Sequence, residues 1–267
     1  MPIEVHARRV EFDEADSIQW IMRDITERKE LDRLREDLTA MIYHDLRSPL
    51  ANIVSSLDVL YSMVTEDDKE TVMTILKIAE NSTDRIQRLV SSLLDVSRLE
   101  SGQPVADQKA VETLELIKSA VRDVTPVADG RHQTLSTELP DQLPSIWVDE
   151  DMARRVLINL MENASKFSPA GGRIEMGAHE EGEWIHMWVK DNGPGIAAAE
   201  QERIFDKFTR LRGAGKPGGL GIGLAFCRLA VLGHGGHIWV ESEPGSGAVF
   251  HFTFPTATPE QLAGNIN

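Results

Sequence analysis

The chain has 267 residues, with 28 basic and 43 acidic side chains and a formal net charge of −15 at pH 7. Hydrophobic and charged contents of 41% and 27% are typical of a globular protein, and an acidic surface argues against general nucleic-acid binding. The single cysteine, Cys227, excludes an internal disulfide framework, and no apolar run has the length of a membrane span or the form of a secretory leader. We expect a cytoplasmic chain, or the soluble piece of a longer receptor, without a membrane segment.

The N-terminal part of the chain changes its hydrophobic period once. Residues 1–23 alternate weakly between apolar and polar positions, which predicts two short strands. Apolar side chains then follow at intervals of three and four residues, a heptad seam: Leu31, Leu34, Leu38 and Met41. We expect one helix over 27–64, a polar turn over 65–70 and a second helix that ends at the Gly and Pro of 101–104.

This helical hairpin is expected to need a partner. A lone pair of helices cannot bury both of its apolar stripes, whereas two hairpins side by side can bury them in a four-helix bundle. The sequence therefore predicts a homodimer.

After Pro104 the patterns of strands and helices are mixed. We expect helices over 111–128, 150–167, 198–205 and 219–232. Strand patterns cover 133–138, 145–148, 173–179, 184–190, 237–242 and 248–254. Hairpin-paired strands beside helices predict an α/β sandwich with a mixed sheet rather than a doubly wound parallel sheet.

Two glycine-rich stretches occupy positions where backbone N–H groups could close on an anion. DNGPG (191–195) follows a predicted strand, and GGLGIG (218–223) precedes a predicted helix. Either stretch alone is equally compatible with a tight turn. Neither is a P-loop or a dinucleotide fingerprint, because Gly215-Lys216 is followed by Pro217 and no strand leads into 219–223.

A third element favours a nucleotide site. Asn159, Asn163 and Lys166 are spaced i, i+4 and i+7 on a predicted helix and so share one face. An amide oxygen can ligate Mg²⁺, and an ammonium group can neutralise phosphate charge. Asp191, ionised and buried beside its turn, could accept a hydrogen bond from an adenine amino group.

Five motifs in order resemble those of the sensor histidine kinases of bacterial two-component systems. NLMENASKFS resembles the N box, DNGPGI the G1 box, IFDKF the F box and GGLGIGLAF the G2 box, while MIYHDLRSPLANI resembles the phosphoacceptor H box. Together they span residues 41–226. The resemblance implies a multidomain α and α+β chain that uses ATP and Mg²⁺.

The resemblance also implies where the domains lie. Residues 1–26 are similar to the closing strand and exit motif of a PAS sensor domain, and 27–101 would be the dimerisation and histidine-phosphotransfer hairpin. A linker (102–110), a Bergerat-type ATP-binding domain (111–256) and a C-terminal tail (257–267) would follow.

By this resemblance, Asn163 is the Mg²⁺ ligand, supported by Asn159, and Asp191 reads the adenine. The other implied nucleotide-binding residues are Lys166, Phe167, Gly193, Gly195, Gly219, Leu220, Gly221, Gly223 and Leu224. Residues 206–218 would form a lid over the nucleotide, with Arg210 contacting the γ-phosphate.

His44 is the implied phosphoacceptor. Asp45 could hydrogen-bond its Nδ1–H and leave Nε2 free to attack. Hydrolytic relatives carry a glutamate where this chain has Asn159, and an amide cannot act as a general base. The resemblance therefore implies transfer from ATP to His44 and then to an aspartate of a response-regulator receiver domain.

Two alternatives stay open at this point. Ser48 occupies the position at which the family often carries Thr or Asn for dephosphorylating the regulator, so the chain could work mainly as a phosphatase or binding module. It could also be a hydrolytic ATPase of the wider superfamily. Seven other histidines show no metal-ligand spacing with cysteines or acids along the chain and are read as structural: His6, His132, His179, His186, His234, His237 and His251.

Overall fold

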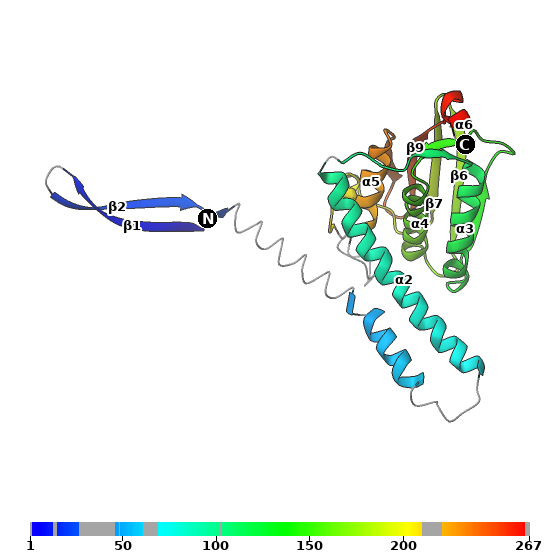
Figure 1. Cartoon of the computed structure of the whole chain (residues 1–267), viewed down its shortest axis with the longest axis horizontal. Coiled ribbons are helices and arrows are strands. Elements are labelled where there is room, and N and C mark those ends of the chain that lie inside the picture. Colours follow the sequence, from blue (N-terminus) through cyan, green and yellow to red (C-terminus); the bar gives the residue numbers. More distant parts are fainter. Residues whose placement is uncertain are drawn as a thin grey trace. The chain divides into compact units, whose positions relative to one another are not determined.

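A computed structural model describes residues 2–12, 15–26, 46–47, 49–60, 69–101, 103–209 and 221–264 (Figure 1). The chain divides into two compact units, Met1–Thr83 and Asp84–Asn267. Within the described ranges, no helix combines the length and the hydropathy needed to cross a bilayer.

The first unit begins with an antiparallel hairpin of β1 (Ile3–Phe12) and β2 (Ala15–Asp24). Asp24 ends the second strand, because its Oδ1 accepts hydrogen bonds from the backbone N–H (2.8 Å) and the hydroxyl (2.6 Å) of Thr26. The two strands expected in residues 1–23 are confirmed. Their assignment to a PAS domain stays a prediction.

Helical segments follow the hairpin. Residues 46–47 and 49–60 are helical, and helix α2 (Lys69–Glu100) continues from the first unit into the second. The second predicted helix is thus confirmed, and the first is confirmed over its described residues. His44, Asp45 and Ser48 lie outside the described residues.

The helix of residues 49–60 has one partly buried face and one exposed apolar face. One face is buried or half-buried and carries Ile53, Ser56 and Leu60. The other is 47–54% exposed and carries Leu50, Val54 and Leu57. A second copy of the chain is the partner that the predicted four-helix bundle would place on the exposed face.

The second unit is built on a five-stranded sheet. Its strand order is β4 (Thr134–Glu138), β6 (Arg173–Glu181), β7 (Trp184–Asp191), β9 (Ala248–Pro255) and β8 (Ile238–Ser242). The β4–β6 pair is parallel and the other pairs are antiparallel. The predicted mixed sheet is therefore confirmed.

Three helices cover this sheet (Figure 1): α3 (Thr113–Asp129), α4 (Glu150–Phe167) and α5 (Gly223–Gly233). Alternate residues of β7 show which face they cover, because Ile185, Met187 and Val189 are completely buried while Trp184 and His186 are only half-buried. Phe250, Phe252 and Phe254 extend the buried face along β9. One face of the sheet thus packs on the helices, and the other carries aromatic and histidine side chains.

The structure differs from the expected elements in three places. The helix expected over 198–205 is wrong: two 3₁₀ turns, Ala198–Glu200 and Arg203–Phe205, form instead. Ile204 and Phe205 follow each other in the chain and are both buried. An amphipathic α-helix does not suit this arrangement, because it would place consecutive side chains about 100° apart. Helix α5 begins at Gly223 rather than at residue 219. Two short elements were not expected: strand β3 (Lys109–Val111), which pairs with β5 (Ile146–Val148), and helix α6 (Pro259–Gly264).

Candidate nucleotide-binding site

Helix α4 carries the first part of the site. Its N-terminus is capped by Asp149, whose carboxylate accepts a hydrogen bond from the backbone N–H of Met152 at 3.0 Å. Asn159, Asn163 and Lys166 follow on one face of the helix and are all half-buried. This face carries two amides and an ammonium group in a partly water-shielded position.

The start of helix α5 lies beside this face. A Cβ placed on Gly223 would lie 3.8 Å from both Cγ and Oδ1 of Asn159. Ile222, which precedes the helix, offers no side-chain cap to its first backbone N–H groups. The N-terminus of α5, with Gly223 and Leu224, is therefore suited to an anion held next to Asn159.

Asp191 ends β7 and is 8% exposed. Burial raises the pKa of its carboxyl group, and hydrogen bonds from the backbone N–H groups of Gly193 (2.7 Å to Oδ1) and Ala248 oppose that rise. The backbone therefore orients a carboxylate in a poorly hydrated position. Such a group can accept a hydrogen bond from a base amino group.

Close backbone approaches join Asp191 to the end of α4. A Cβ on Gly193 would lie 2.8 Å from Oδ1 of Asp191 and 3.1 Å from the carbonyl oxygen of Phe167, so a larger residue would push the two apart. Phe167 is 37% exposed, and the ammonium group of Lys166 lies 5.1 Å from its ring centroid. The predicted residues Phe167, Asp191 and Gly193 thus form one cluster.

The turn around Asp191 tolerates only glycine at two positions. Gly195 has φ +74° and Gly247 has φ +81°, and a Cβ would overlap a backbone oxygen in each case, that of Glu243 and of Asp191 respectively. The backbone N–H of Gly245 donates to the carbonyl oxygen of Pro194 at 2.7 Å. These contacts hold the β8–β9 turn against the end of β7.

A backbone hydrogen bond joins the start of the predicted lid to a residue that follows the lid in the chain. The N–H of Phe208 donates to the carbonyl oxygen of Gly221 at 2.9 Å. Both residues have positive φ, 63° and 67°. Arg210, Gly219 and Leu220 lie outside the described residues, so their predicted roles are not tested.

Sequence reasoning missed a residue that positions the C-terminal end of α4. Gln133 is 5% exposed, and its Nε2 lies within hydrogen-bonding distance of the carbonyl oxygens of Ser165 (2.8 Å), Pro169 (3.1 Å) and Ser168 (3.3 Å). Its Oε1 accepts a hydrogen bond of 2.6 Å from the Ser165 hydroxyl. No local pattern distinguishes this glutamine, because its partners lie more than thirty residues away in the chain.

Arg155 connects α4 to the second half of α2. Its guanidinium pairs with Asp95, donates to the hydroxyl of Ser92 at 2.9 Å and lies 4.2 Å from the ring centroid of Phe226. A second ion pair, Lys207 with Glu100 at 2.6 Å, joins the same helix to the first residues of the predicted lid. Both contacts lie within the second unit.

Two family models match the chain. The "His Kinase A (phospho-acceptor) domain" matches residues 34–102, and the "Histidine kinase-, DNA gyrase B-, and HSP90-like ATPase" matches residues 148–258. The second match includes every described residue of the nucleotide site.

Curated relatives and a solved structure agree with these matches. The adaptive-response sensory kinase SasA of Thermosynechococcus vestitus is 34% identical over 85% of this chain and 63% of its own length. The sensor histidine kinase WalK of Bacillus subtilis is 32% identical over 92% of this chain and 40% of its own length, so the chain spans only part of either relative.

The crystal structure of full-length ShkA in complex with AMPPNP has a TM-score of 0.59 and 28% identity, over 84% of this chain and 46% of that one. Its fold therefore extends over both matched regions. The phosphoacceptor and ATPase matches, the relatives and the shared fold show together that this chain belongs to the sensor histidine kinases of two-component systems.

Proposed function

We propose that this chain is an ATP-dependent protein-histidine kinase that phosphorylates its own His44 and passes the phosphoryl group to an aspartate of a response regulator. The observation that carries the proposal is the presence of two clusters along helix α4 in a domain of the ATPase family. Asn159 lies against the uncapped start of α5, and the buried Asp191 lies against the end of α4. The first suits phosphates and the second suits a base.

Each cluster has a defined role in this proposal. The second carboxylate oxygen of Asp191 accepts from the adenine amino group, while Oδ1 is held by the Gly193 N–H. Gly193 and Gly195 shape the adenine side, and Gly221, Gly223 and Leu224 shape the phosphate side together with Gly219 and Leu220. Phe167 contacts the base or ribose, Lys166 contacts a phosphate, and Arg210 contacts the γ-phosphate.

A magnesium ion fits the amide donors of α4. Asn163 would hold Mg²⁺, which supplies charge neutralisation to the phosphates when bound, and Asn159 would support it. Amide ligands are neutral, so the site depends on the phosphates for most of its negative charge. We expect Mg²⁺ affinity to be weak in the absence of nucleotide.

The choice of His44 as the phosphoryl acceptor rests on the absence of a general base at position 159. Asn159 cannot take a proton from water, so hydrolysis has no base at that position. His44 brings its own nucleophilic nitrogen, and Asp45 would orient it by accepting from Nδ1–H. Ser48 would orient a water molecule if the chain also dephosphorylates its regulator.

The functional unit is proposed to be a homodimer. Leu50, Val54 and Leu57 are spaced four and three residues apart and stay exposed on one helix face. Exposed Met73 and Leu76 extend the apolar surface onto α2. Closure of a four-helix bundle would bury all five side chains.

Labelling with [γ-³²P]ATP and Mg²⁺ tests the proposal. We expect acid-labile, base-stable label on the wild-type chain and none on His44→Ala, while both proteins bind nucleotide equally. Label that persists in His44→Ala would contradict the assigned acceptor. Sustained phosphate release without phosphohistidine would favour the hydrolytic alternative, and rapid loss of aspartyl phosphate from a regulator would favour the phosphatase alternative.

A further inference from the structure

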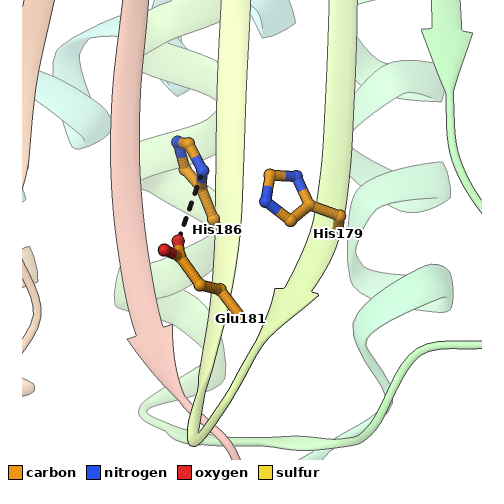
Figure 2. Close-up of side chains that lie close together, drawn as sticks. All are labelled: His179, Glu181 and His186. Atoms are coloured by element: carbon orange, nitrogen blue, oxygen red, sulfur yellow. Dashed lines mark ion pairs between the residues drawn. The ribbon is translucent and has the colours of Figure 1, made fainter.

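A cluster of histidines lies on the face of the sheet opposite the helices. His179 on β6 and His186 on β7 are directly opposite each other across the hairpin, with ring centroids 4.8 Å apart. Glu181 lies two residues beyond His179 and therefore on the same face. Figure 2 shows the three side chains converging, with Glu181 Oε2 3.8 Å from Nδ1 of His186.

The hairpin turn is what brings these residues together. Gly182 and Glu183 form a two-residue loop, and Gly182 has φ +63°. A two-residue loop with glycine first fixes the register of the strands, so His179 must face His186. Their spacing along the chain does not reveal this, since the juxtaposition arises across strands.

We propose that His179, Glu181 and His186 form a binding site for a divalent transition-metal ion, with Zn²⁺ as its best match. One donor atom from each residue lies within 4.8 Å of the other two. Donors around tetrahedral Zn²⁺ lie about 3.3 Å apart, given bond lengths of about 2.0–2.1 Å. Side-chain rotation can bring the donor atoms to this shorter separation, because His179 is exposed and the Glu181 side chain is 69% accessible.

The donor types select the metal. Two imidazoles and one carboxylate form a set that Zn²⁺ accepts with one position left open, whereas Mg²⁺ and Ca²⁺ prefer oxygen ligands alone. The site would therefore hold Zn²⁺ with a water molecule in the fourth position. It would not compete with the amide site proposed for Mg²⁺ on α4.

A second histidine supports His186 from behind. Nε2 of His186 lies 3.0 Å from Nδ1 of His251, so His186 can donate there while its Nδ1 faces Glu181. Nε2 of His251 has no hydrogen-bond partner and lies 3.9 Å from Oε2 of Glu241. Hydrogen-bonded chains of this kind fix the tautomer and the orientation of a metal-binding imidazole.

Tryptophan side chains hold these rings in place. The rings of His186 and His251 both stack on Trp239. The ring centroid of His186 lies 5.2 Å from that of Trp239 at an interplanar angle of 29°, and the centroid of His251 lies 5.1 Å from it at 12°. Trp188 lies 5.6 Å from His179. The imidazoles of His186 and His251 are only 14% and 15% exposed, whereas the side chains of Glu181 and Glu241 are 69% and 71% exposed.

The site is separate from the nucleotide site. His186 and Asp191 belong to the same strand but point to opposite faces, and five residues of strand span about 17 Å. Zn²⁺ bound here would link β6 to β7 at their hairpin end and stabilise that end of the sheet. Nucleotide binding should therefore not depend on it.

Titration of the metal-stripped full chain with ZnCl₂, in competition with a chromogenic chelator, tests the site. We expect one Zn²⁺ per chain and an affinity that falls by about 100-fold or more in His179→Ala and Glu181→Gln, since loss of an outer-shell partner alone costs about 10–100-fold. His251→Phe keeps the stacking on Trp239 but removes the acceptor, and should weaken Zn²⁺ binding by about 10–100-fold.

Two matched variants serve as controls. His237→Ala removes a histidine that stacks on Trp239 outside the cluster, and Glu180→Gln removes an exposed carboxylate from the other side of β6. Both should bind Zn²⁺ as the wild type does, and AMPPNP affinity should be equal in all variants. No Zn²⁺ binding by the wild type, or binding that is unchanged in His179→Ala and Glu181→Gln, would overturn the proposal.

Discussion

At the scale of single residues, Asp191 shows how one carboxyl group is prepared for one task. The Gly193 N–H occupies Oδ1, and burial keeps water away from the group. The pKa of Asp191 is raised in the folded protein. The carboxyl group therefore contributes to stability at pH values below its pKa in the unfolded chain, and this contribution is lost as the pH rises through its pKa in the folded protein. An ionised Asp191 at neutral pH therefore costs folding free energy and serves binding instead.

We predict that Asp191→Asn abolishes most of the nucleotide affinity without unfolding the domain. The amide oxygen would keep the Gly193 N–H, and the NH₂ group would then face the adenine amino group, donor against donor. A hydrogen bond to a charged group is worth about 1.5–3 kcal/mol, so AMPPNP affinity should fall by about 10–150-fold in calorimetric titration. Asp141→Asn, on an exposed residue of the same domain between β4 and β5, is the control, and equal affinity of Asp191→Asn and wild type would refute the assigned role.

His234 links the other ends of two helices. Its Nε2 accepts from the backbone N–H of Asp149 at 3.0 Å, and its Nδ1 donates to the carbonyl oxygen of Ala230 at 2.7 Å. Burial lowers the pKa of this histidine, and the Ala230 hydrogen bond and Asp149 oppose the shift. Protonation would replace the acceptor at Nε2 with a second donor.

We therefore predict that stability falls as pH drops below about 6.5, the unperturbed histidine value. Between this value and the lower pKa of the folded protein, His234 binds a proton in the unfolded chain but not in the folded one. Each such group lowers the free energy of unfolding by at most about 1.4 kcal/mol for each pH unit. Urea denaturation at several values between pH 5 and 8 measures the free energy of unfolding as a function of pH. This free energy should change less with pH in His234→Asn than in the wild type, whereas His237→Gln should keep the wild-type pH dependence. The same pH dependence in all three proteins would contradict the role of His234.

At the scale of elements, α4 shows what sequence can predict. The sequence predicts a helix over residues 150–167, and the helix has these bounds, with Asp149 as its N-cap. The anchoring of its C-terminal end by Gln133 was not predicted, because that contact depends on where β4 places the glutamine. Elements with strong local signals were therefore predictable, and long-range polar contacts were not.

The same distinction applies to the sites. Residues of the nucleotide site were recognisable because each lies in a contiguous motif, although the structure describes only those outside 210–220. The opposition of His179 and His186 depends on strand register, and its one available signal was the Gly182-Glu183 turn. The helix predicted over 198–205 was wrong because tertiary burial of Ile204 and Phe205 prevailed over helix propensity.

We predict that Gln133→Ala lowers the unfolding free energy by about 1–3 kcal/mol, because it removes the buried acceptor of the Ser165 hydroxyl and the amide donor that lies against the carbonyl oxygens at the end of α4. Urea denaturation of the full chain followed by the tryptophan signal measures this change. Gln103→Ala, on an exposed residue between α2 and β3, should leave the midpoint unchanged. Equal midpoints for the two variants would show that Gln133 does not anchor α4.

At the scale of the whole molecule, the exposed stripe of Leu50, Val54 and Leu57 is the feature that calls for a second copy. A charge placed in the stripe should be buried without a partner on dimerisation, which is strongly unfavourable. We predict that Val54→Glu is a monomer in sedimentation experiments at concentrations where the wild type is a dimer. Its nucleotide affinity should stay that of the wild type.

The neighbouring residue offers a matched control. Ser55 is exposed and lies about 100° around the helix from Val54, so Ser55→Glu adds the same charge outside the stripe. This variant should remain dimeric. A wild-type chain that sediments as a monomer, or a dimer that survives Val54→Glu, would exclude the proposed bundle.

The hydrogen bond between Phe208 and Gly221 has an evolutionary consequence. It holds Phe208 and Gly221 side by side, so the number of residues between them can change without displacing either one. The entropic cost of closing a loop rises by only about 0.6 kcal/mol when the length of the loop doubles. Insertions and deletions between these two residues should therefore cost the domain little stability, which leaves this part of the chain open to change in evolution.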